Sequence, residues 1–114
     1  MINFPEEKLK QFAVASVQEA VSKVPLPEGY VINEFFSEVY VALKAWLRFS
    51  LSHNFPMPTE EIGKDHNMIP LLVESLNVSS KNIEQIVKGS LLRAEAQSWL
   101  TYLITDLQSR LHND

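Results

Sequence analysis

The chain has 114 residues, of which 46% are hydrophobic, and it carries a formal net charge of −4 at pH 7. This length suits one domain with a single core, so we predict one domain over residues 1–114, and the absence of cysteine excludes a disulfide scaffold, a thiolate metal site and a cysteine nucleophile. The acidic balance and the scattered positions of the ten Lys and Arg residues disfavour nucleic-acid binding, although they allow a local basic patch.

The N-terminal residues lead into the first predicted helix, over residues 5–24. They lack a basic segment followed by an apolar run, so we do not expect a signal peptide. Pro5 suits the first helical position, and Glu6 and Glu7 suit the positive end of the helix dipole. Apolar residues at helical spacing form one stripe, namely Leu9, Phe12, Ala13, Val17, Ala20, Val21 and Val24. The segment Pro25–Gly29 then ends the helix.

The second predicted helix, over residues 31–53, is the most apolar part of the chain, with 14 aliphatic or aromatic residues among 23. Such a helix belongs in the centre of a bundle. Its polar positions fall on one narrow face, with acidic residues early and basic residues late: Glu34, Ser37, Glu38, Lys44, Arg48 and Ser52. Because these charges make membrane insertion costly, we predict no membrane association. The absence of cysteine fits a cytoplasmic protein.

The second half of the chain is predicted to contain two or three helices after a proline-bearing loop at 54–64. A short helix over 68–76 has Asn67 as its cap and Pro70 in its first turn. The segment Asn77–Ser80 is predicted to break it before a helix over 81–88. Gly89 either separates that helix from the last one, over 90–112, or lies within one long helix. The last helix has an apolar seam formed by Leu92, Ala96, Trp99, Leu100, Leu103, Leu107 and Leu111.

These elements predict an all-α, up-and-down bundle of four to five helices with the apolar helix 31–53 at its centre. Apolar surface that the bundle cannot bury would form a homodimer interface. The aromatic residues of helix 31–53, and Tyr30 directly before it, are expected to pack in the core rather than to form a surface that stacks on nucleic-acid bases: Tyr30, Phe35, Phe36, Tyr40, Trp46 and Phe49.

Few residues have the spacing of a catalytic or metal site. Arg48 and His53 combine a cation that can stabilise a phosphate transition state with a general acid or base. They are about 140° apart on one helix, so they could act together only across a dimer. Both also suit structural roles at a helix end. No metal or cofactor is predicted, because no motif spacing joins the acidic and histidine residues that could bind one, namely His53, Glu60, Glu61, Asp65 and His66.

Two segments of the chain match the pattern of a known family. The first is the run over 41–47, with Ala42, Lys44 and Ala45 at the matching positions. The second is the run over 64–76, with matching residues at His66, Leu71, Leu72 and Leu76. With the loop between them, these segments resemble HEPN domains over about residues 35–76. The resemblance implies a helical bundle that is commonly dimeric and often paired with a small nucleotidyltransferase.

Some HEPN domains are ribonucleases with an arginine and a histidine separated by four to six residues, and Arg48 and His53 match that spacing. The family usually carries this motif on a later helix, where this chain has no such pair. We therefore favour a non-catalytic, HEPN-like interaction module that acts through homodimerisation or a protein partner. The alternatives are a ribonuclease toxin that uses Arg48 and His53 across a dimer cleft, and a small structural helical protein.

Overall fold

The computed structural model describes residues 6–52 and 67–112, with the backbone alone over 49–52. Within these ranges the chain forms four α-helices and one short 3-10 helix, and it forms no strand. The elements are α1 (Glu6–Lys23), α2 (Ile32–Ser52), α3 (Ile69–Lys81), η1 (Ile83–Gln85) and α4 (Ser90–His112). The prediction of an all-α bundle is confirmed. None of the described helices is long and apolar enough to cross a membrane.

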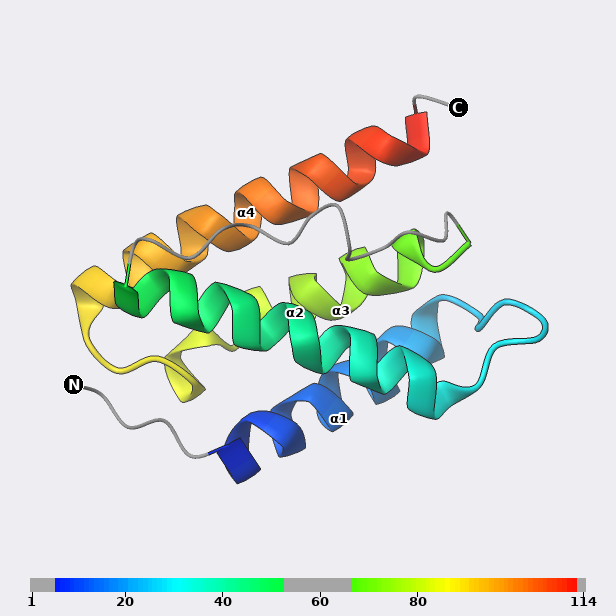
Figure 1. Cartoon of the computed structure of the whole chain (residues 1–114), viewed down its shortest axis with the longest axis horizontal. Helices are drawn as coiled ribbons and strands as arrows, with labels where there is room; N and C mark the ends of the chain where they lie inside the picture. Colours follow the sequence, from blue (N-terminus) through cyan, green and yellow to red (C-terminus); the bar gives the residue numbers. More distant parts are fainter. Residues whose placement is uncertain (1–5, 53–66, 113–114) are drawn as a thin grey trace.

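The four helices form a ring in which each helix packs on two neighbours. α1 contacts α2 and α3, while α4 contacts the same two helices from the other side. α2 and α3 also touch across the middle, so each of these two helices packs against all three others; the apolar sequence of α2 predicted this for α2. Neighbours around the ring are antiparallel, but α2 ends and α3 begins at opposite ends of the bundle, so these consecutive helices run in the same direction (Figure 1). The bundle therefore departs from the predicted up-and-down arrangement, in which consecutive helices alternate in direction.

The core contains the apolar stripes that helical spacing predicted. On α2, the large side chains of Phe35, Leu43 and Trp46 are completely buried. The predicted stripe residues of α1 and α4 are either buried or packed partly buried against this core. Apolar residues of α3 at helical spacing are buried as well: Ile69, Leu72, Val73 and Leu76. Periodicity therefore located the buried faces of α1 and α4.

α3 differs from its predicted form because it does not break at residues 77–80. It continues to Lys81, and Val78 and Ser79 are buried within it. The hydroxyl of Ser79 donates a hydrogen bond to the Ser75 carbonyl at 3.0 Å, so the helix itself satisfies this serine. Asn67 does not cap the helix, since Met68 takes the N-cap position without a side-chain hydrogen bond, whereas Pro70 lies in the first turn as predicted.

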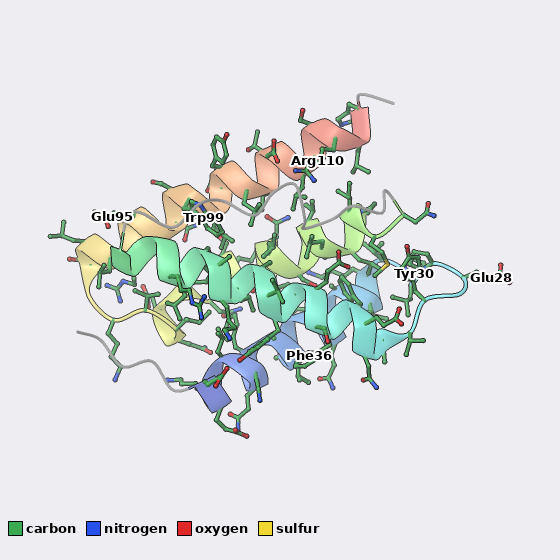
Figure 2. All side chains as sticks on the ribbon, viewed as in Figure 1. Glu28, Tyr30, Phe36, Glu95, Trp99 and Arg110 are labelled. Atoms are coloured by element: carbon green, nitrogen blue, oxygen red, sulfur yellow. The ribbon has the colours of Figure 1, made fainter. Side chains whose placement is uncertain are left out.

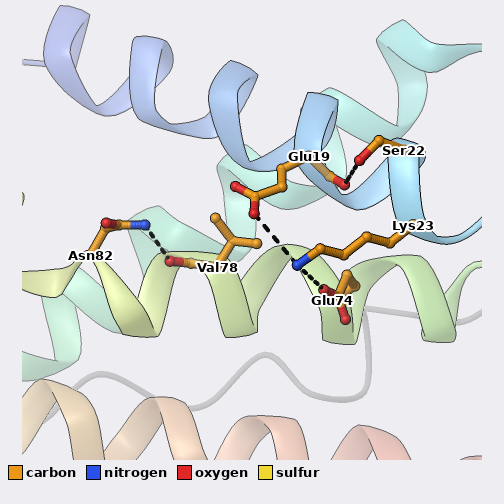
Figure 3. Close-up of polar contacts among 6 residues, drawn as sticks. All are labelled: Glu19, Ser22, Lys23, Glu74, Val78 and Asn82. Carbon is orange, nitrogen blue, oxygen red and sulfur yellow. Dashed lines mark hydrogen bonds and ion pairs between the residues drawn. The ribbon is translucent and has the colours of Figure 1, made fainter.

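The connection between α3 and α4 also contains less helix than the sequence predicted. Asn82 ends α3: its backbone N–H lies within hydrogen-bond distance of the Val78 carbonyl, and its side-chain amide donates to the same oxygen at 3.0 Å (Figure 3). In place of a helix over 81–88, the chain forms only η1. Gly89 has a φ of +105°, a left-handed conformation that favours glycine, and α4 begins directly after it. Gly89 therefore separates the elements, which was one of the two predicted alternatives.

Surface ion pairs join the end of α1 to the middle of α3. The Lys23 ammonium lies 3.2 Å from a Glu74 carboxylate oxygen and 3.4 Å from a Glu19 oxygen, as Figure 3 shows. Hydrogen bonding to Glu74, and then to Glu19, raises the pKa of Lys23. Because the lysine is 45% exposed, solvent screens these attractions, and they orient the two helices more than they stabilise them.

Candidate functional site

The outer face of α2 is the surface on which the predicted polar positions lie. Glu34, Ser37, Val41 and Arg48 are all exposed and follow one another at helical spacing, so they form a single stripe that faces away from the core. Val41, in the middle of this stripe, is 53% exposed. We call these four residues the α2 outer face.

A polar cluster borders this face on the side of α1. The Tyr40 hydroxyl donates a 2.6 Å hydrogen bond to a carboxylate oxygen of Glu6, and the Lys44 ammonium lies 3.4 Å from the same oxygen. The hydrogen bond to Glu6 raises the pKa of Tyr40 to about 12, since the phenol proton is held by the carboxylate. The hydrogen bonds from Tyr40 and Lys44 lower the pKa of Glu6. The first turn of α1 is thus tied to the middle of α2.

Aromatic contacts extend this cluster along the groove between the two helices. The rings of Phe36 and Tyr40 stack with centroids 6.2 Å apart and an interplanar angle of 22°. The ammonium of Lys44 lies 5.2 Å from the centre of the Tyr40 ring, and that of Lys10 lies 6.0 Å away, both within the range of a cation–π attraction. Figure 2 shows Phe36 on the side of α2 that faces α1. These contacts make the border of the α2 outer face well ordered.

A small cleft of about 260 Å³ opens where the start of α1 meets the last part of α2. It is lined by Glu6, Leu9, Lys44, Leu47 and Arg48. Its floor is apolar, since Leu9 and Leu47 are buried, and its rim carries two cations and one carboxylate. Such a cleft can hold an anionic group against Lys44 and Arg48. Among its five lining residues, the groups that could act as a general base or a nucleophile are the Glu6 carboxylate and the Lys44 amine, which lie 3.4 Å apart as an ion pair.

The residues predicted to act together fall partly outside the described ranges. Arg48 is exposed and lines the cleft, while His53 lies beyond the described part of α2. The metal-site residues considered from the sequence, Glu60, Glu61, Asp65 and His66, also lie outside it. Over residues 6–52 and 67–112, no group of three or more His, Asp or Glu residues is arranged to hold a metal ion.

The positions that carry the HEPN resemblance are mostly core positions where they are described. Ala42 and Ala45 are buried on α2, and Leu71, Leu72 and Leu76 are buried on α3. Lys44 is the exception, since it belongs to the polar cluster around Tyr40. Packing is therefore a sufficient reason for these buried residue types at these positions, whichever function the chain has.

Within residues 6–52 and 67–112, the charges that look scattered in the sequence are divided unequally between the two halves of the bundle. In the half where α1 begins and α2 finishes, on the left of Figure 1, seven cations accompany four carboxylates: Lys8, Lys10, Lys44, Arg48, Lys81, Lys88 and Arg93 with Glu6, Glu7, Glu84 and Glu95. In the opposite half, six carboxylates accompany two cations: Glu19, Glu28, Glu34, Glu38, Glu74 and Asp106 with Lys23 and Arg110. Sequence reasoning missed this polarity because it depends on the direction in which each helix runs.

Comparisons of the chain with protein-family models, with curated proteins and with solved structures give no match. The functional argument therefore rests on the α2 outer face, the Tyr40 cluster and the distribution of charge.

Proposed function

We propose that this protein is a non-catalytic, HEPN-like helical interaction module that acts through homodimerisation or a protein partner, with the α2 outer face as the contact surface. The observation that carries the proposal is Val41, which is 53% exposed at the middle of the most apolar helix of the bundle. A single exposed valine is ordinary on a protein surface. This one lies on the same stripe as charged residues of opposite sign, Glu34 and Arg48, as a contact centre with a polar rim would.

The chemistry of the neighbouring cleft also supports binding rather than turnover. Its cations, Lys44 and Arg48, can attract and position an anionic group, while Glu6 partly neutralises them. The Glu6 carboxylate and the Lys44 ammonium are paired with each other, which suits a role in orienting a partner. The resemblance to HEPN domains, which are commonly dimeric, points in the same direction.

Substituting Val41 with aspartate is expected to weaken self-association and to leave the monomer stable. The substitution puts an unpaired carboxylate at the centre of the contact, where desolvating it is costly. In the isolated bundle the position is exposed, so the free energy of unfolding should change by no more than about 0.5 kcal/mol. Light scattering across a concentration series measures the association, and urea denaturation measures the stability.

Tyr102→Asp provides the matched control, because Tyr102 is 56% exposed on α4. It introduces the same charge without touching the α2 outer face, and it should leave the association unchanged. Equal association of wild type and Val41→Asp would contradict the use of this face. A wild-type protein that stays monomeric at every concentration would exclude homodimerisation and leave a different protein as the partner.

A second candidate function is the cleavage of RNA, and one observation favours it: Arg48 lines the same cleft as Lys44, so two cations could hold a phosphate. On this hypothesis His53 supplies the acid or base across a dimer. Arg48→Ala should then abolish RNA cleavage while stability stays nearly constant, because Arg48 is exposed. Cleavage that persists in Arg48→Ala, measured on a labelled RNA, would rule out this role for the arginine.

A further inference from the structure

The charges of α2 are arranged symmetrically around Val41, with opposite signs on the two sides. Glu34 precedes Val41 by seven residues and Arg48 follows it by seven. Glu38 precedes it by three residues and Lys44 follows it by three. The helix is therefore acidic before Val41 and basic after it, and the acidic and basic residues lie at equal sequence separations from this exposed valine.

Helix geometry places the outer pair on one line with Val41. Seven residues are almost two full turns, so Glu34 and Arg48 are each displaced by only about 20° from Val41, and by about 10.5 Å along the axis. Burial agrees, because all three residues are exposed. The inner pair, Glu38 and Lys44, lies about 60° to either side, and both side chains are half-buried at the borders of the face.

We infer that a second copy of this chain binds the α2 outer face in an antiparallel orientation, with a two-fold axis at Val41. In this arrangement each Glu34 lies opposite Arg48 of the partner subunit, and the two Val41 side chains meet at the axis. A parallel arrangement would instead set like charges against each other, which is unfavourable. The two-fold axis makes the same surface serve both subunits, so assembly closes at a dimer.

The charge polarity of the whole bundle favours the same orientation. When two copies lie antiparallel, the basic end of each bundle lies beside the acidic end of the other. This inference rests on the proposed function, since it names the partner and the register of the α2 outer face. One helix face is smaller than the roughly 800 Å² that each partner of a stable complex usually buries, so the dimer is weak and sensitive to salt.

The proposed register and the cleavage of RNA require different contacts of Arg48. Opposite a carboxylate of the partner subunit, the guanidinium is paired and no longer available to stabilise a phosphate. An anionic partner such as RNA would use the basic end of the bundle and would make no use of Glu34. A dependence of self-association on Glu34 therefore distinguishes a second copy from a polyanion as the occupant of this face.

The test uses two single charge reversals, Glu34→Lys and Arg48→Glu, and their equimolar mixture, with mass in solution measured by sedimentation equilibrium at low salt. In a dimer of either variant alone, positions 34 and 48 carry charges of the same sign, and the two-fold axis repeats this repulsive contact twice. The dimer should therefore dissociate at a concentration at least about tenfold higher than that of wild type. In the mixture, Lys replaces Glu in one subunit and Glu replaces Arg in the other, so both pairs are again of opposite sign. The mixture should recover a dimer that neither variant forms alone.

Matched controls come from the connection between α3 and α4, where Glu84 and Lys88 are exposed. Glu84→Lys and Lys88→Glu change the net charge by the same amounts but lie off the α2 outer face, so wild-type dimerisation should persist. Recovery in the mixture also shows that both single variants are folded.

The remaining outcomes separate this register from the proposed function. A wild-type dimer that survives both single reversals would overturn the register while leaving the interaction module in place. Single variants that dissociate and do not recover on mixing would overturn the antiparallel orientation. A wild-type chain that is monomeric throughout would overturn both the register and homodimerisation.

Discussion

Replacing Trp46 with alanine is expected to lower the free energy of unfolding by about 3–5 kcal/mol, the range for a large aromatic side chain removed from a core. Trp46 is completely buried on α2, one of the two helices that pack on all three others. Its neighbours cannot close the resulting cavity without moving two or more helices. Urea denaturation followed by far-UV circular dichroism measures the change.

Trp46→Phe serves as the control for the size of this effect. The indole N–H of Trp46 is buried and makes no hydrogen bond within the described residues. Phenylalanine therefore removes volume but breaks no polar contact, and it should cost clearly less than alanine. If Trp46→Ala cost under about 1 kcal/mol, α2 would not form the interior of this bundle.

Ser79→Ala is expected to destabilise the protein by about 1–3 kcal/mol, although it removes only one oxygen atom. The hydroxyls of Ser16 on α1 and Ser79 on α3 lie 3.1 Å apart, and both residues are buried. Because Ser79 donates to the Ser75 carbonyl, Ser16 donates to Ser79. Alanine at 79 leaves the Ser16 hydroxyl in the core without this acceptor. Chemical denaturation of the variant measures the cost.

Two further variants isolate the hydrogen bond from general effects of the substitution. The double variant Ser16→Ala/Ser79→Ala also removes the Ser16 hydroxyl that would otherwise lack its acceptor. Its loss in the free energy of unfolding should therefore be smaller than the sum of the losses in the two single variants. Ser75→Ala, one turn earlier on α3, removes a buried hydroxyl that has no partner among the described residues, and it should be neutral or stabilising. Additive single effects, or an equal cost at 75 and 79, would contradict the pairing of Ser16 with Ser79.

The same serines explain why one helix boundary was predicted incorrectly. Residues 77–80 contain three polar residues with a weak helical preference, Asn77, Ser79 and Ser80. In the fold, Ser79 faces α1, where its small side chain and its hydrogen bond to Ser16 suit a close contact between the helices. Local propensity favours a break, and the tertiary contact overrides it.

The candidate site shows a similar division between local pattern and tertiary contact. The alternation from acidic to basic along α2 is visible in the chain itself. The link from Tyr40 and Lys44 to Glu6 is not, because it joins residues more than thirty positions apart through the packing of α1 on α2. Val41 likewise belongs to an apolar run, and only the positions of α1 and α4 show which member of that run remains exposed.

Helical periodicity in this sequence was sufficient to determine the all-α class, the buried stripes of α1 and α4, and the opposite charges at the two halves of α2. These properties depend on spacings of three or four residues, which the helix itself defines. The tertiary structure decided the length of α3, the exposed position of Val41, the parallel course of α2 and α3 (Figure 1), and the unequal distribution of the described charges between the two halves of the bundle. Those properties depend on which helices meet and in which direction, and such contacts are set by the packing of side chains distant in sequence.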